Sequence, residues 1–251
     1  MDRPFVVSCS QKGFLVAVRL QVISAIKQLI KNLICCRRFA RMVVFVALKL
    51  HNFSYAIAGR FSQFLEPGWL HPKHRIIQYH EWFKKQVRSE WDVLDIGCGN
   101  GALAYDLKKV CKHVTAIDIS KDNIEKAKER FATDGITYIC GDATTYTFDD
   151  AFDAIVLSNV LEHITDRTKF LKRLPMCGPK GNAIILLRVP MIDRDWITLY
   201  KKERGVEWRL DRSHTIEYTL DTLTEELEAA GLVLYDYKVQ FGELYAVVKK
   251  K

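Results

Sequence analysis

The sequence lacks the cysteine spacings that bind structural zinc or build a disulfide framework. Its seven cysteines include no CxxC pair and no Cys–His ligand spacing, and most lie in apolar stretches. An odd number of cysteines without such spacings is typical of reduced thiols in a reducing compartment. We therefore expect a cytoplasmic protein in which one sizeable hydrophobic core, rather than cross-links, provides the stability.

Acidic residues are scarce in the first third of the chain. Residues 1–90 hold 15 Lys and Arg against 4 Asp and Glu, whereas residues 91–251 hold 23 against 26. The formal charge of +8 therefore comes from the N-terminal third, and the remainder is close to neutral. This asymmetry indicates a segment that meets an anionic surface.

An uninterrupted apolar run long enough to span a membrane is also missing near the N-terminus. Arg19, Lys27 and Lys31 break every window near the ~20 residues that a spanning helix requires. The apolar stretch 42–48 is too short and ends at Lys49. No cleaved signal peptide is predicted, because Arg19 interrupts the candidate apolar region.

Residues 21–34 instead show the period of an amphipathic helix, and Arg37, Arg38 and Arg41 extend its basic character. Two interpretations are open. Residues 21–41 could lie on an anionic membrane surface, peripheral at the inner face, or the apolar side could pack on the neighbouring domain. That side holds Val22, Ile23, Ala25, Ile26, Leu29, Ile30, Leu33 and Ile34.

The clearest break in the chain is Glu66-Pro67-Gly68. We therefore expect a basic amphipathic helical extension over residues 1–70 and the main domain over residues 71–251. The main domain begins with a predicted helix from residue 76 to residue 88, which could cover a ligand pocket.

Three residues at the start of this region have two explanations. His71, His74 and Tyr79 could point toward the pocket. A polar helix start with an aromatic packing face explains them equally well.

From residue 92 onward, short apolar segments alternate with amphipathic ones. Strands are expected at residues 92–96, 114–119, 136–140, 154–157, 183–187, 233–240 and 244–249, and helices at 102–110, 121–132, 166–174 and 220–230. Continuous apolar strands separated by helices are typical of a parallel sheet that is covered on both faces. The sequence predicts an α/β fold with a doubly wound, mostly parallel sheet and an antiparallel C-terminal hairpin.

A glycine-rich loop follows the first of these strands. Its sequence is Gly97-Cys98-Gly99-Asn100-Gly101, and a predicted helix begins directly after it. Glycines allow a ligand to approach the backbone, and the helix N-terminus favours negative charge. The spacing is G-x-G-x-G, which differs from the G-x-G-x-x-G of dinucleotide-binding proteins.

Polar residues follow the next three strands, at the edge where ligands bind in doubly wound sheets. Asp118 comes nineteen residues after Gly99 and is placed to accept hydrogen bonds from two ribose hydroxyls. Asp142 and Ala143 end the third strand, where they could bind an adenine edge, and Ser158-Asn159 ends the fourth. The four strand ends together indicate one nucleoside-sized ligand.

These motifs resemble the class I S-adenosylmethionine-dependent methyltransferases. The resemblance rests on VLDIGCGNG, on Asp118 within VTAIDIS, on Gly141-Asp142 and on FDAIVLSNVLEHI, and it covers about residues 71–251. It implies a seven-stranded sheet, parallel except for the last strand, with the cofactor across the ends of the first strands. The cofactor-binding residues that it implies are Asp95, Gly97, Cys98, Gly99, Gly101, Asp118, Ile119, Asp142, Ala143, Ser158 and Asn159.

Within that resemblance, each group has an expected role. Gly97, Gly99 and Gly101 would lie against the amino-acid part of the cofactor, and Asp95 would approach its ammonium. Asn159 would line the side that carries the methyl group.

A hydroxyl acceptor needs a general base, and His163 is the leading candidate because imidazole titrates near neutrality. Glu162 and His214 are the other predicted catalytic residues. Glu162-His163 resembles the metal-associated pair of the ubiquinone-pathway O-methyltransferases. In that group another glutamate precedes the pair by three residues, where this chain has Asn159, so no metal is predicted.

The segment 188–218 is long for a connection between a strand and a helix, and it is rich in charged and aromatic residues. We expect a lid over the acceptor, in which Arg209, Arg212 and His214 could hold an anionic group. A salt-bridged surface excursion without a ligand is the alternative.

The resemblance implies methyl transfer to a small-molecule, glycan or lipid-linked acceptor, with oxygen as the expected acceptor atom. The competing hypothesis is an RNA methyltransferase or nucleic-acid-binding protein that uses the basic N-terminal third. Against it, Ser158-Asn159-Val160-Leu161 lacks the double proline typical of base amino-group methyltransferases. A catalytically silent scaffold is the third hypothesis, and the intact glycine loop argues against lost cofactor binding.

Overall fold

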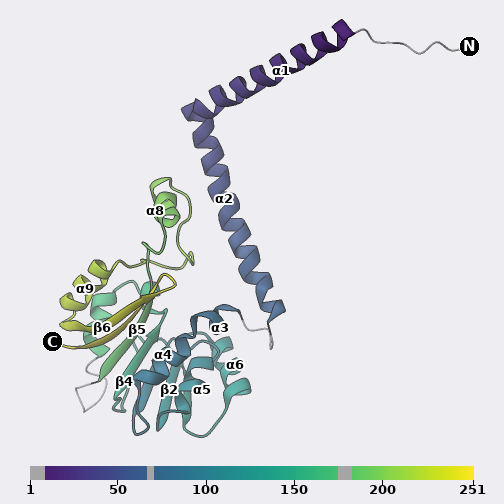
Figure 1. The fold of residues 1–251 in the computed structure, drawn as a ribbon. Helices are drawn as coiled ribbons and strands as arrows, with labels where there is room; N and C mark the ends of the chain where they lie inside the picture. The colour runs from purple at the N-terminus through teal and green to yellow at the C-terminus, as the bar shows by residue number, and fades with distance from the viewer. Residues whose placement is uncertain (1–8, 67–70, 175–182) are drawn as a thin grey trace, which may run out of the picture. The chain divides into compact units, whose positions relative to one another are not determined.

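The computed structural model describes residues 9–66, 71–174 and 183–251, drawn in colour in Figure 1. The chain forms two compact units, residues 1–57 and residues 58–251. The first unit holds helix α1 (Cys9–Cys35) and most of helix α2 (Arg37–Ser62).

Helix α2 corrects one sequence-based expectation. No segment near the N-terminus was expected to be long and apolar enough to span a membrane, but α2 continues through Lys49 and is followed by a short 3-10 helix, η1 (Gln63–Leu65). The segment Arg37–Leu65 holds an 18-residue window with a mean hydropathy of 1.4. By length and composition alone, it could cross a membrane.

The second unit begins with two short helices where the sequence predicts one. Helix α3 (Lys73–Ile77) ends and helix α4 (Tyr79–Gln86) begins at Gln78, which has the left-handed φ of 52°. The single helix predicted from residue 76 to residue 88 is therefore wrong. The break matters because Tyr79 and His80 begin a new helix beside the glycine loop.

The central sheet has seven strands in the order β3-β2-β1-β4-β5-β7-β6, and β7 runs antiparallel to both of its neighbours (Figure 1). The other neighbouring pairs are parallel. This arrangement confirms the predicted fold class. The strands are β1 (Asp92–Ile96), β2 (His113–Asp118), β3 (Ile136–Cys140), β4 (Ala154–Ser158), β5 (Ile184–Pro190), β6 (Leu232–Gln240) and β7 (Glu243–Lys250).

Helices cover both faces of the sheet. The remaining helices are α5 (Ala102–Lys108), α6 (Lys121–Phe131), η3 (Leu161–His163), α7 (Arg167–Arg173), α8 (Trp196–Glu203) and α9 (Leu220–Ala229). One core cluster joins the sheet to α4, α5 and α6, and a second joins it to α7 and α9. Alternation along β1 separates the two cores, since Val93 belongs to the first and Leu94 to the second.

The predicted strands and helices of the sheet domain lie within a few residues of the observed ones, with β5 running to Pro190. Consequently Arg188 belongs to the sheet, and the connection that was expected to begin there begins at Met191. It carries α8 and returns to the sheet where Met191 pairs with Tyr218.

Candidate functional site

The glycine loop is fastened to the end of the neighbouring strand. The N–H groups of Gly97 and Cys98 donate to the carbonyl of Ile117 at 2.8 and 3.1 Å, and the N–H of Gly99 donates to Oδ2 of Asp118 at 2.8 Å. A Cβ on Gly97 would lie 2.5 Å from a methyl group of Val160, in the loop after β4. The loop is therefore held between the ends of β2 and β4, where the sequence places it.

Gly101 has a different role from the other two glycines. Its φ is 81°, and a Cβ there would lie 2.8 Å from both the Tyr138 hydroxyl and the Cβ of Ala127. This glycine lets α5 begin close to α6 and β3. Gly97 and Gly99 line the second cavity described below, and Gly101 is constrained by this packing.

Substituting Gly101 should therefore cost stability through two effects. Gly101→Ala should lower the free energy of unfolding by the left-handed penalty of about 1–2 kcal/mol and by a steric cost of similar size. Gly231→Ala is the matched control, because Gly231 has a φ of 77° and nothing within 4 Å of the added Cβ. Urea unfolding should show a clearly larger loss for Gly101→Ala, and equal losses would refute the packing role.

Asp118 is fixed at the end of β2 by three donors. Besides the N–H of Gly99, its carboxylate accepts the N–H of Ser120 at 2.8 Å and the side-chain amide of Asn123 at 3.2 Å. The residue is 9% exposed, so its remaining lone pairs face the cavity. This is the geometry expected of a carboxylate that binds a pair of ribose hydroxyls.

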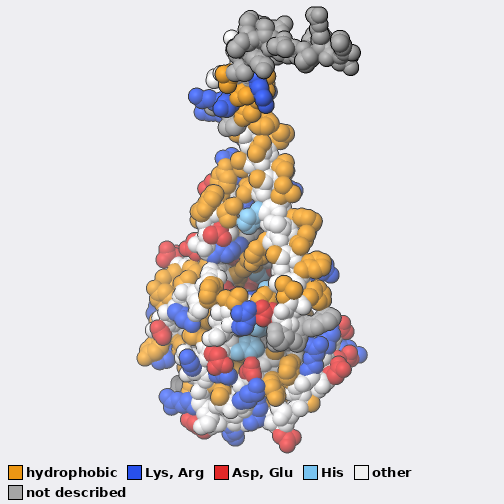
Figure 2. Space-filling view, turned by 45° about the vertical axis from the view of Figure 1, so that its right-hand side comes forward, with side chains coloured by type: hydrophobic (Ala, Val, Ile, Leu, Met, Phe, Trp, Pro, Cys, Tyr) orange, Lys and Arg blue, Asp and Glu red, His pale blue; other side chains and the backbone are white. Residues whose placement is uncertain are grey.

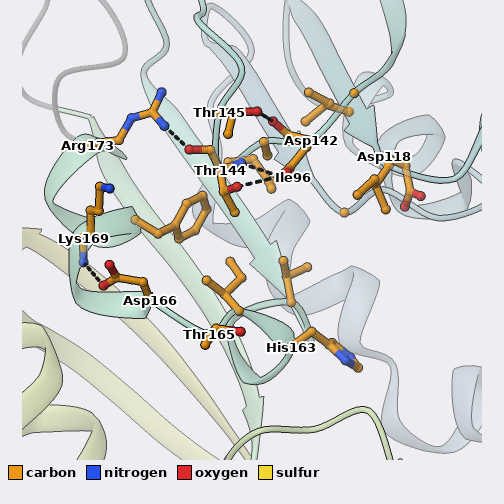
Figure 3. A pocket seen from close by; sticks show the side chains of 18 residues that line it. Ile96, Asp118, Asp142, Thr144, Thr145, His163, Thr165, Asp166, Lys169 and Arg173 are labelled. Atoms are coloured by element: carbon orange, nitrogen blue, oxygen red, sulfur yellow. Dashed lines mark hydrogen bonds between the residues drawn. The ribbon is translucent and has the colours of Figure 1, made fainter.

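Two adjoining cavities flank the loop and meet at Gly97. The first, of about 510 Å³, is drawn in Figure 3. Its walls are apolar, from Ile96, Val160 and Phe170, and its polar groups include Asp118 and Asp142. Such a lining suits a flat heterocyclic base joined to a sugar. Of the predicted cofactor-binding residues, it brings together Gly97, Asp118, Ile119, Asp142 and Ala143.

The second cavity, of about 670 Å³, lies on the side of α3, α4 and α5. Asp95, Cys98, Gly99 and Ser158 line it from the sheet, and His74 and Tyr79 line it from the two short helices. The interpretation that His74 and Tyr79 face a pocket therefore fits the structure. Tyr105, Asp106 and Phe131 complete the wall, and no motif in the sequence marks them.

Asp95 is the chemically distinctive group of this second cavity. It is 1% exposed, and its Oδ2 has no hydrogen-bond partner. Burial, aided by the nearby charge of Asp118, raises the pKa of Asp95 to about 8. A buried carboxyl without a partner suits an ammonium group, such as that of the cofactor implied by the resemblance.

This pKa predicts how the stability of the ligand-free protein depends on pH. The folded value lies above the unfolded value of 3.8, so the stabilisation is present below about pH 4 and is lost as pH rises toward 8. Asp95→Asn should remove this slope from the free energy of unfolding measured by urea denaturation between pH 4 and 8. An unchanged slope would show that Asp95 titrates normally.

A buried ion pair lies beside the second cavity. Arg188 of β5 is 3% exposed, and its guanidinium donates to both oxygens of Glu243 of β7 at 2.8 and 3.0 Å. The same guanidinium lies 3.8 Å from the ring centroid of Tyr79. Sequence reasoning missed this pair, because only the register of β5 and β7 brings the two residues together. The sequence carried one signal of this pair: each of the two apolar strands contains a charged residue.

Asn159 lies next to this ion pair. It was expected to line the methyl-bearing side of the cofactor; it has a φ of 56°, and its backbone N–H donates to the Arg188 carbonyl at 2.8 Å. Its side-chain amide lies beside both members of the ion pair, with the amide nitrogen 3.4 Å from Oε1 of Glu243. Val160, the next residue, lines the first cavity.

The three predicted catalytic residues are brought together after β4. His163 lines the first cavity, and its ring lies 4.8 Å from that of His214, centroid to centroid. In Figure 3 the imidazole of His163 points away from Asp142 and Thr144, on the opposite side of the cavity. Glu162 is fully buried behind it, and burial raises its pKa to about 7.

A hydrogen-bond chain determines which nitrogen of His163 carries the proton. Ser213 donates to Oδ1 of Asp211 at 2.6 Å, because a carboxylate can only accept. The Ser213 oxygen therefore accepts from Nδ1 of His163 at 3.1 Å. This leaves the lone pair on Nε2. His163 is exposed, but partial desolvation by the surrounding residues and the neighbouring His214 lower its pKa below the usual 6.5, so the neutral form prevails at pH 7.

His214 occupies a structural position in the connection between β5 and α9. It is 6% exposed, and its Nδ1 lies 3.1 Å from Glu217, which Arg194 also binds. Arg209 is paired with Glu207 at 2.9 Å. Of the three residues expected to hold an anion, His214 and Arg209 are already engaged by carboxylates, and Arg212 is exposed.

One set of side chains in the described ranges could hold a metal ion. Glu162, His163 and His214 each offer a ligand atom, and these atoms lie within 4.8 Å of one another. No metal was predicted from the sequence. The three residues were predicted as catalytic, but their approach to within ligand distance depends on the fold, since His214 comes from a separate segment of the chain.

Comparisons with known proteins agree with this geometry. Residues 94–184 match the model of a methyltransferase domain. The ubiquinone biosynthesis O-methyltransferase of Bradyrhizobium diazoefficiens is 33% identical over 217 residues, covering 75% of this chain and 83% of that protein. An uncharacterized methyltransferase of Mycobacterium tuberculosis is 41% identical over 96 residues. That match covers 38% of this chain and about half, 49%, of the mycobacterial protein.

Solved structures share the fold at low sequence identity. DhpI in complex with S-adenosylhomocysteine superimposes with a TM-score of 0.56 and 21% identity, over 71% of this chain and 86% of its own. The N-methyltransferase NodS of Bradyrhizobium japonicum gives 0.53 and 17%, over 69% and 86%. With the glycine loop, Asp118 and the sheet order in place, the chain belongs to the class I S-adenosylmethionine-dependent methyltransferases.

Proposed function

We propose that this protein transfers the methyl group of S-adenosylmethionine to an oxygen of a small-molecule, glycan or lipid-linked acceptor. The observation that carries the proposal is the chain from Asp211 through Ser213 to His163, a residue that lines the first cavity, because this chain leaves the lone pair of the imidazole on Nε2. The Bradyrhizobium relative, named as an O-methyltransferase, supports oxygen as the acceptor atom.

The donor brings its own chemistry. S-adenosylmethionine supplies an activated methyl group together with its leaving group, so the protein mainly aligns the reactants and handles one proton. Asp118 and Asp142 bind the nucleoside part, and Asp95 pairs with the ammonium.

His163 deals with the proton of the acceptor. Nε2 of His163 takes the hydroxyl proton as the oxygen becomes the nucleophile, and Ser213 and Asp211 stabilise the resulting imidazolium through Nδ1–H.

The pH dependence of turnover follows from the lowered pKa of His163. Methyl transfer requires neutral His163, so kcat should stay level above the ordinary histidine value of 6.5 and fall only at lower pH. A methyl-transfer assay across this range, with saturating cofactor, checks the prediction. An acid limb with its midpoint above 6.5 would exclude His163 as the base.

The acceptor class is tested by labelling. The protein is incubated with methyl-labelled S-adenosylmethionine and fractionated cell extract, and the label is traced to small molecules, glycans, lipids, RNA or protein. Label in an O-methyl group of one of the first three fractions supports the proposal. Label confined to RNA would favour the nucleic-acid alternative and contradict it.

A further inference from the structure

Helix α2 carries an apolar stripe that the fold of the first unit leaves exposed. The stripe consists of Met42, Val43, Val46, Leu50, Phe53 and Ile57, each between 42 and 64% exposed. At about 100° per residue, the six side chains fall within an arc of about 100° on one side of the helix. Hydrophobic side chains are visible along this helix in Figure 2.

The charge around the stripe is of one sign. From residue 3 to residue 65 the sequence has ten Lys and Arg and no Asp or Glu. Arg37, Arg38, Arg41 and Lys49 of α2 lie outside the arc of the stripe, and Arg38 and Lys49 lie within about 40° of its edge. An apolar face bordered by cations complements an anionic lipid surface.

We propose that α2 docks in the surface of an anionic bilayer through this stripe, with its axis in the membrane plane. The sequence-based expectation placed the membrane contact at residues 21–41, where Ile26, Leu29 and Ile30 are 49–60% exposed. The stripe of α2 adds a second exposed apolar surface at residues 42–57. The proposal is independent of the methyl-transfer reaction.

The polar residues of α2 favour this surface position over a spanning one. Lys49, His51 and Asn52 lie near the middle of the segment Arg37–Leu65, so a spanning helix would place a charge at the bilayer centre. In the membrane plane, the same residues stay among the headgroups while the stripe enters the acyl boundary.

A second copy of the chain is a less suitable partner for the stripe. Pairing two stripes would bring Arg38 and Lys49 of both copies to the seam, and residues 3–65 offer no carboxylate to neutralise them. An anionic headgroup layer supplies the missing charge.

The test is flotation of the full-length protein with vesicles of phosphatidylcholine and phosphatidylglycerol, and with vesicles of phosphatidylcholine alone. Phe53→Asp should lower the partition coefficient on anionic vesicles about tenfold or more. Tyr55→Asp is the matched control: Tyr55 is 65% exposed against 64% for Phe53, and it lies on the opposite side of the helix. It should change partitioning less than about threefold, since only the added charge acts.

Each outcome is decisive. Equal losses for Phe53→Asp and Tyr55→Asp, or equal wild-type binding to neutral vesicles, would overturn the proposal. Resistance to alkaline carbonate extraction would show a spanning helix instead, and a vesicle-free dimer that Phe53→Asp dissociates would assign the stripe to a second copy. Unchanged affinity of both variants for S-adenosylhomocysteine, measured by calorimetry, shows that the sheet domain remains folded.

Discussion

His163→Gln should lower kcat for methyl transfer by about 10²–10⁴-fold, the range that a positioned general base contributes. Its affinity for S-adenosylhomocysteine should stay within about twofold, because the nucleoside-binding carboxylates lie elsewhere in the cavity. Calorimetry and a single-turnover assay separate the two effects. Full activity in His163→Gln would show that His163 is not the general base.

Asp211→Asn tests the role of His163 as the base by changing the hydrogen bonds that determine its tautomer. An amide at residue 211 can donate to Ser213, whose hydroxyl is then free to donate to Nδ1 of His163, which would place the proton on Nε2. We expect kcat to fall by about 10-fold or more, because a proton on Nε2 leaves no lone pair there to accept the proton of the acceptor hydroxyl. Ser213→Ala is the control: it removes the chain without imposing the wrong tautomer, so its loss should be smaller.

Asp118→Ala should weaken binding of S-adenosylhomocysteine by about 10²-fold or more. Two hydrogen bonds to a charged carboxylate, at about 1.5–3 kcal/mol each, would be lost. The glycine loop would also lose the acceptor of the Gly99 N–H. Asp122→Ala removes the same charge from an exposed position four residues away and should leave the affinity within about twofold. Equal affinities for both variants would refute the pocket assignment.

The sheet and the glycine loop were predictable because their signals are local. Each parallel strand is a short apolar run, and the residues that follow it necessarily meet at one edge of the sheet. Asp118 and Asp142 could therefore be assigned to one ligand before any coordinates. The same reasoning placed His163 at this edge, since it comes shortly after β4.

Contacts that depend on the tertiary structure could not be predicted from the sequence. Arg188 and Glu243 are fifty-five residues apart and meet only through the antiparallel pairing of β5 with β7. The Ser213–His163 bond needs the connection after β5 to fold back over η3. The break at Gln78 had no signal either, because the left-handed conformation is uncommon for glutamine and no glycine marks it.

The central claim is that His163 presents an unprotonated Nε2 to the acceptor, and nitrogen NMR of histidine-labelled protein with bound S-adenosylhomocysteine tests it most directly. The His163 signal among the seven histidines is assigned by its loss in His163→Gln. We predict a neutral ring at pH 7 with the proton on Nδ1, which titrates below pH 6.5. A neutral ring with the proton on Nε2, or a ring still charged at pH 7, would contradict the account.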